Sequence, residues 1–139
     1  MNSNTDLKII VVICLSLFLV SCGASMTKGE KWLESKTAKP EINIAGTWAC
    51  PEWGIAMFKQ EERQITGMLG DYPVKGVVSG NSIYLLMYSD ERVDYFAELK
   101  ASDMNIFKGF YSKYYTFDEL RDRPDFIRPM KLQRIFTSP

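Results

Sequence analysis

The side chains most often used for catalysis are scarce in this chain of 139 residues, which contains no histidine. Without histidine there is no Ser–His or Cys–His pair to activate a nucleophile, and the single cysteine that we expect to stay free makes no credible zinc site. Paired carboxylates can hydrolyse glycosides, but here the acids fall mostly in turns, where polar residues are common. They are Glu61, Glu62, Asp90, Glu91, Asp118, Asp122 and Asp125. The sequence therefore predicts no enzyme, no catalytic residue, no metal and no cofactor.

Cys22 has the clearest chemical context, because it ends an almost wholly apolar run that begins at residue 9. The run covers residues 9–20, and a membrane-spanning helix needs about twenty such residues. A shorter run behind a polar head is typical of the apolar region of a secretory signal peptide. We therefore expect residues 1–21 to be a signal peptide.

Residues 19–22, Leu-Val-Ser-Cys, resemble the lipobox of bacterial lipoproteins. In that family the cysteine thiol receives a lipid and cleavage makes the cysteine the mature N-terminus. The resemblance implies lipidation of Cys22 and attachment to a bacterial membrane. Because Gly23 rather than aspartate follows, the similarity to Gram-negative lipoproteins favours the outer membrane, facing the periplasm. The alternative is an ordinary signal peptide or apolar anchor with an incidental cysteine.

The charge balance excludes some partners, because 17 basic and 17 acidic residues give no net charge. We therefore expect no nucleic-acid partner. If Cys14 leaves with the signal and Cys22 carries lipid, only Cys50 remains, and no internal disulfide can form. Cys50 is interpreted as a small buried hydrophobic residue, with a reactive thiol or an intermolecular bridge as the alternatives.

Residues 22–43 are polar and predict a lipidated N-terminus followed by a flexible tether, with one helical turn near residues 29–35. Residues 44–139 form the expected folded domain. Short apolar runs separated by turn signals recur there about every ten residues, which favours an antiparallel meander or barrel. The expected strands are residues 44–50, 54–60, 64–70, 73–79, 82–89, 93–100, 104–112 and 129–135. Gly80-Asn81 is a strong hairpin signal between two of them.

Two further patterns refine this fold. Gly67, Gly76 and Gly109 each follow an apolar and a polar residue, so alternation places all three on one face. Glycine within strands suggests close backbone approach, and we expect these three to line the inside of a strongly curved sheet. Thr116 and Glu119 have capping-box spacing, which predicts a short helix over residues 117–121 before the last strand.

Gly46-Thr47-Trp48 at the start of the first strand, with a meander after it, resembles the lipocalin and avidin-like small barrels. In lipocalins this tryptophan packs across the barrel floor against a basic residue of the last strand, and Arg134 has that position here. The resemblance implies a mainly β, roughly eight-stranded lipocalin-like barrel, with Gly46, Trp48 and Arg134 closing it. Strands this short give a barrel that side chains fill or that holds one small ligand.

Aromatic residues are the best candidates for binding a ligand or partner. The candidates are Trp53, Tyr111, Tyr114, Tyr115 and Phe117, of which the last four lie where a strand should end. Alternatively, these rings fill the barrel. We expect a membrane-anchored, non-enzymatic binding module for a small apolar ligand or lipid. The alternative is a periplasmic inhibitor or interaction protein that uses loops on a filled barrel to hold an envelope protein.

Overall fold

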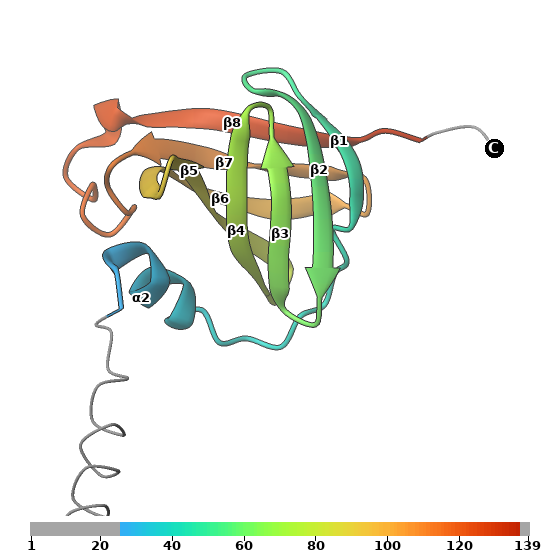
Figure 1. Ribbon diagram of the computed structural model, residues 1–139, viewed down its shortest axis with the longest axis horizontal. Coiled ribbons are helices and arrows are strands. Elements are labelled where there is room, and N and C mark those ends of the chain that lie inside the picture. Colours follow the sequence, from blue (N-terminus) through green and yellow to red (C-terminus); the bar gives the residue numbers. More distant parts are fainter. Residues whose placement is uncertain (1–25, 137–139) are drawn as a thin grey trace, which may run out of the picture.

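The computed structural model describes residues 26–136, which form an eight-stranded antiparallel barrel with one α-helix outside it (Figure 1). The helix is α2 (Lys28–Glu34). The strands are β1 (Gly46–Cys50), β2 (Gly54–Glu61), β3 (Gln64–Leu69), β4 (Tyr72–Ser79), β5 (Ser82–Ser89), β6 (Arg92–Asp103), β7 (Ile106–Lys113) and β8 (Ile127–Arg134). Each strand pairs with the next, and β8 returns to β1. The mainly β meander that closes into a barrel is therefore confirmed.

Side chains fill the barrel interior. Alternating residues of each strand point inward, and the largest of them are fully buried. These include Trp48, Phe107, Ile65, Leu69, Ile83, Leu85, Met87, Leu99 and Leu132. The interior of an eight-stranded barrel is just wide enough for side chains to fill it. In this barrel the core side chains occupy the space that could otherwise hold a ligand.

Gly67, Gly76 and Gly109 lie on the inward face, as the repeated pattern predicts, and they allow neighbouring strands to approach closely. Their register partners, which include Val74, Leu85 and Leu99, are interior core residues. A Cβ at any of the three positions would overlap a backbone carbonyl of the adjacent strand. The sheet can therefore coil tightly enough to close with only eight short strands.

Trp48 and Arg134 meet at the lower end of the barrel, which is the end of the β2–β3, β4–β5 and β6–β7 turns. They are register partners, and the Arg134 guanidinium carbon lies 4.3 Å from the Trp48 ring centre. Trp48 Nε1 donates a hydrogen bond of 2.8 Å to the Ile44 carbonyl, and its ring packs edge-on against Phe107. Arg134 donates to the Ala45 carbonyl at 2.8 Å. This is the juxtaposition that the lipocalin resemblance implied.

The seam between β1 and β8 is short. Only Trp48–Arg134 and Ala49–Gln133 are in register, so β8 residues 127–131 have no strand on their β1 side in the described chain. The Ile135 amide donates a hydrogen bond to the Thr47 carbonyl of β1. Because backbone groups alternate between the two sides of a strand, the amide and carbonyl groups of residues 131, 129 and 127 also point toward the β1 side. Residue 129 is a proline and has no amide proton.

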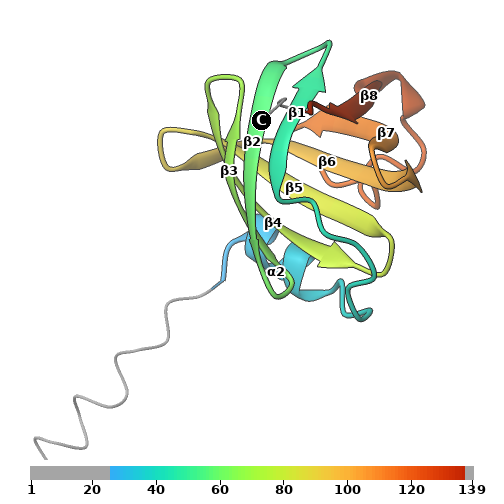
Figure 2. The same ribbon diagram turned by 90° about the vertical axis from the view of Figure 1, so that its right-hand side faces the viewer.

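The described part of the expected tether, residues 26–43, packs against the barrel instead of hanging free. Thr27 caps α2 through a complete capping box with Glu30, and the helix buries Trp32 (6% exposed) and Leu33 against outer-face side chains. Those side chains are Val77, Leu86 and Phe96. Hydrogen bonds from the Glu41 amide to Gly80 and from Gly80 to Lys39 fasten the following segment. Figure 2 shows α2 lying against the outside of the barrel wall. The second apolar cluster, outside the barrel, thus explains why a largely polar segment is ordered.

The prediction of a helix over residues 117–121 is wrong. Thr116 and Glu119 exchange both hydrogen bonds of a capping box, but residues 117–122 form turns and are followed by a 3₁₀ turn, Pro124–Phe126. Pro124 disfavours helical backbone at the residue before it, and too few residues precede it to repay helix nucleation. The one α-helix of the described chain is α2.

The expected signal peptide, residues 1–21, and the expected lipidation site, Cys22, lie outside the described residues. Within residues 26–136, none of the helices is both long enough and apolar enough to cross a membrane.

Candidate functional site

Four aromatic side chains plug the upper end of the barrel, which is the end of the β1–β2, β3–β4 and β5–β6 turns. Trp53 sits at their centre, with ring-centre distances of 5.1 Å to Tyr72, 4.7 Å to Tyr95 and 5.1 Å to Tyr111. All three contacts are edge-to-face, which is a favoured arrangement of aromatic rings. The plug closes the end opposite Trp48 and Arg134, so the interior is closed at both ends.

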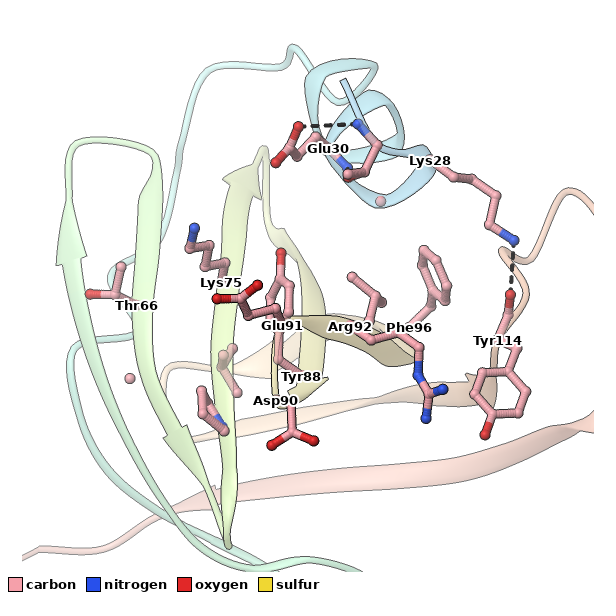
Figure 3. A pocket seen from close by; sticks show the side chains of 16 residues that line it. Lys28, Glu30, Thr66, Lys75, Tyr88, Asp90, Glu91, Arg92, Phe96 and Tyr114 are labelled. Atoms are coloured by element: carbon pink, nitrogen blue, oxygen red, sulfur yellow. Dashed lines mark hydrogen bonds between the residues drawn. The ribbon is translucent and has the colours of Figure 1, made fainter. Parts of the chain in front are cut away.

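A groove of about 910 Å³ lies outside the barrel wall, between the N-terminal end of α2, the outer face of β3 and β4, and the β5–β6 hairpin (Figure 3). The apolar side chains that line it include Pro73, Tyr88 and Val93, with the buried Phe96 behind them. Charged residues of both signs surround this surface: Lys28, Glu30, Lys75, Asp90, Glu91 and Arg92. We take this groove as the candidate functional site.

A β-bulge in the β5–β6 hairpin shapes one side of the groove. Met87 pairs with Tyr95, but Tyr88 pairs with Val93, so Asp94 is the extra residue. Regular alternation would send Val93 into the barrel with Tyr95, whereas the bulge turns it outward into the groove. Asp94 is nearly buried, and its carboxylate accepts a hydrogen bond of 3.0 Å from Arg92 Nε. The ion pair orients Arg92 at the edge of the groove.

Tyr114 lies at the edge of the groove in an unusual backbone conformation. Its φ is +66°, which bulky residues rarely adopt, and its side chain is 43% exposed. The centre of the ring lies 5.0 Å from Lys113 Nζ and 5.9 Å from the Arg92 guanidinium carbon. The Tyr114 carbonyl accepts a hydrogen bond of 2.8 Å from Lys28 Nζ. The charge of Tyr114 and its hydrogen bond also raise the pKa of Lys113. These contacts hold an exposed ring in place at a cost in backbone strain.

Lys28 joins α2 to the loop before β8. Its ammonium lies 3.1 Å from a Glu119 carboxylate oxygen. Partial burial acts to raise the pKa of Glu119, but hydrogen bonds from Thr116 and Lys28 outweigh it and hold this pKa below its ordinary value. Burial raises the pKa of Tyr88 at the base of the groove, with a smaller contribution from Glu30. The groove is built from four parts of the chain, namely residues 27–30, 66–75 and 88–96 together with Tyr114.

The five aromatic candidates from the sequence do not form one site. Trp53 and Tyr111 belong to the upper plug. Tyr114 lines the groove, and Tyr115, 47% exposed, lies beside it with its ring 5.3 Å from Lys28 Nζ. Phe117 packs into the outer cluster, 6.4 Å from the Trp32 ring centre. Sequence reasoning missed the α2 side of the groove, although Thr27 and Glu30 have the capping-box spacing that was recognised at Thr116.

Cys50 is a buried free thiol, and burial, with the nearby Glu52 carboxylate, raises its pKa to about 12. Because the thiolate is the nucleophile, we expect no alkylation of Cys50 by iodoacetamide at neutral pH in the folded protein. Unfolding in urea should expose the thiol and allow rapid labelling. Peptide mass spectrometry of Cys50 before and after unfolding measures this, and labelling in the native state would contradict it.

The fold and site together define a small, filled antiparallel β-barrel with a charged-rimmed groove on its outer face. Residues 26–136 contain no cluster of three or more potential metal ligands. No protein-family model, no curated protein and no solved structure matches this chain.

Proposed function

We propose that this protein is a membrane-anchored lipoprotein whose barrel is a non-enzymatic binding module for a small apolar ligand or lipid. The groove beside α2 is the observation that carries this proposal. Its volume of about 910 Å³ falls in the usual range for small-molecule sites, and aromatic and aliphatic side chains line it beneath a few polar groups. The filled, plugged interior makes the outer groove, rather than the lumen, the favoured binding place.

Native mass spectrometry of the full chain, extracted from its own cell envelope in mild detergent, tests this binding. We expect a co-purified small molecule. Val93→Trp should fill the groove and abolish retention, whereas Phe110→Trp, on the exposed outer face of β7, is the matched control and should retain the molecule. Equal retention by both variants, or none by the parent protein, would count against the groove.

The anchor is the second part of the proposal, and it rests on residues 19–22. We expect Cys22→Ala to leave an uncleaved precursor that incorporates no labelled palmitate, because both lipid transfer and cleavage depend on the thiol. Gel mobility and radiolabelling in the expressing bacterium measure this. Normal maturation and labelling of the variant would refute the assignment.

Binding of an envelope protein is the alternative function, and exposed aromatic residues favour it. Tyr114 and Tyr115 lie close to the groove, and exposed aromatic residues often carry much of the energy of protein association. The same groove and rings would then hold a protein segment. A pull-down from the envelope distinguishes a protein partner from the small molecule that mass spectrometry would detect.

The two tyrosines should matter more for binding than for folding. Because both rings are about half exposed, we expect Tyr114→Ala with Tyr115→Ala to lower the free energy of unfolding by only ~1–2 kcal/mol. Capture of the ligand or partner should fall much further. Urea denaturation beside the capture assay measures both.

Tyr114→Gly is the control for this pair, because glycine adopts a positive φ without strain. It removes the same ring as Tyr114→Ala but should be more stable by up to ~1 kcal/mol. The two single variants should lose binding equally. If binding instead follows stability across the variants, the tyrosines serve the fold alone.

A further inference from the structure

We infer that the groove faces the bilayer to which the protein is anchored, and that it takes one fatty acyl chain of a zwitterionic phospholipid from that bilayer. This rests on the proposed lipid anchor and on the groove as the binding site. Three independent observations lead to it: the short chain between Cys22 and the packed residues, the path of the groove, and the mixed charge at its edge.

The chain between the anchor and the groove is short. The barrel-packed segment begins at the cap residue Thr27, so only five peptide units separate Cys22 from a residue that lines the groove. Five residues span at most ~17 Å whatever their conformation. If residues 22–43 formed a free tether, the barrel could turn any face toward the membrane. Because α2 is packed down, the N-terminal end of α2 must stay close to the bilayer.

The groove has a suitable path for an extended chain. A second hollow of about 310 Å³ follows α2 from the first and shares Glu30, Thr66, Lys75 and Tyr88 with it. The combined path begins at Thr27, at the end of α2 nearest the anchor, and continues past Leu33. An apolar chain that enters at the membrane-facing end can therefore lie along the helix.

The charged side chains at the edge of the groove can pair with a lipid headgroup that carries both a positive and a negative charge. Three basic residues, Lys28, Lys75 and Arg92, and three acidic residues, Glu30, Asp90 and Glu91, line the groove (Figure 3). Ion pairs with Glu119 and Asp94 hold Lys28 and Arg92 in place at its edge. An anionic headgroup alone would meet three carboxylates, and an uncharged ligand would use none of these groups. A phosphate beside an ammonium group can pair with both kinds of side chain. The apolar residues below then contact the acyl chain.

Photocrosslinking in a defined bilayer tests the inference. The mature lipidated protein, whose Cys22 lipid is first verified by intact mass, is reconstituted in vesicles of equal parts phosphatidylethanolamine and phosphatidylglycerol. Tyr88→p-benzoylphenylalanine places the crosslinker at the base of the groove. Met104→p-benzoylphenylalanine (position 83% exposed, at the lower end) and Phe110→p-benzoylphenylalanine (53% exposed, on β7) are the controls.

We expect the Tyr88 variant to gain the mass of phosphatidylethanolamine on irradiation, and the two controls to gain little. Insertion of twenty Gly/Ser residues after Gly23 changes no packed residue, so it tests the membrane-facing geometry without unfolding the barrel. By the usual scaling of effective concentration with linker length, it should reduce the adduct roughly tenfold.

The other outcomes overturn the inference in distinguishable ways. An adduct of phosphatidylglycerol mass excludes the zwitterionic headgroup. An internal crosslink without added mass, mapped by peptide mass spectrometry to the acylated N-terminal peptide, shows that the lipid on Cys22 itself fills the groove. If the Gly/Ser insertion after Gly23 does not reduce the amount of adduct, the groove is not held facing the bilayer. A molecule carried from the cell and crosslinked in place of phospholipid leaves the proposed function standing, whereas no adduct of any kind refutes both.

Discussion

Trp48→Ala should lower the free energy of unfolding by ~3–5 kcal/mol, the usual cost of deleting a fully buried large aromatic side chain. Trp48 has no exposed surface, and it joins the first strand to the last. Loss of the ring leaves a cavity against Phe107 and removes the partner of the Ile44 carbonyl. Urea denaturation followed by circular dichroism measures the change. A cost below ~1.5 kcal/mol would show that the lower end tolerates a cavity.

A double-mutant cycle with Arg134→Ala isolates the contact between the two residues. We expect a coupling of about 0.5–2 kcal/mol, since the guanidinium stacks on the indole and the two residues are cross-strand partners. Arg128, in the same strand but near its other end, is the matched control, and Arg128→Ala should not couple to Trp48→Ala. Equal coupling with both arginines would indicate a general effect of charge on β8.

Gly109→Ala should also be severe, with an expected cost of about 3 kcal/mol or more, above the usual range for overpacking. The added methyl group would overlap the Glu98 carbonyl, which is backbone and cannot rotate away. The adjacent strands β6 and β7 would have to separate at this point of close approach.

Gly54→Ala is the control for Gly109→Ala. Its φ is +103°, so alanine is strained there, but a Cβ would meet nothing within 4 Å. We expect a cost of about 1–2 kcal/mol from the backbone alone. The melting temperatures of the two variants compare the cost of steric overlap at residue 109 with the cost of backbone strain at residue 54. If Gly109→Ala costs no more than Gly54→Ala, the strands have room that the structure does not show.

The barrel could be predicted from sequence because its signals are local. Alternating apolar residues and two-residue turns recur throughout, and Gly80-Asn81 forms the hairpin that its composition indicates, with Gly80 at a φ of +61°. The glycine pattern added tertiary information, since three residues with one register predicted one strongly curved face. Strand ends differed from the structure by a few residues at most.

The segment before the barrel could not be predicted in the same way. Trp32 and Leu33 are two apolar residues in a polar segment, and their binding surface is the outer face of β4–β6, which a sequence reading assigns to solvent. Conversely, the capping box at Thr116 formed its hydrogen bonds without a helix, because Pro124 limits the length available. A local motif thus indicates a local contact, while the tertiary surroundings decide whether a helix follows.

The sequence also predicted only part of the candidate site, because tertiary contacts place the remaining residues. Tyr114 was identified as a binding residue from its place after a strand, and it does line the groove. Val93 could not be identified, because a bulge at Asp94 reverses the face that alternation assigns to it. Lys28 and Gly29 complete the groove only because α2 packs beside the β5–β6 hairpin.

The short seam between β1 and β8 has a consequence for self-association. An exposed strand edge with free amide and carbonyl groups is a template on which other chains can add and aggregate. On the β1 side of residues 127–131, Pro129 has no amide proton and the Ile127 amide already donates to Pro124. Only the Lys131 amide remains as a donor, and its charged side chain discourages a second strand from approaching. This edge of β8 therefore offers few backbone donors to a second chain, which makes it a poor template for edge-to-edge association.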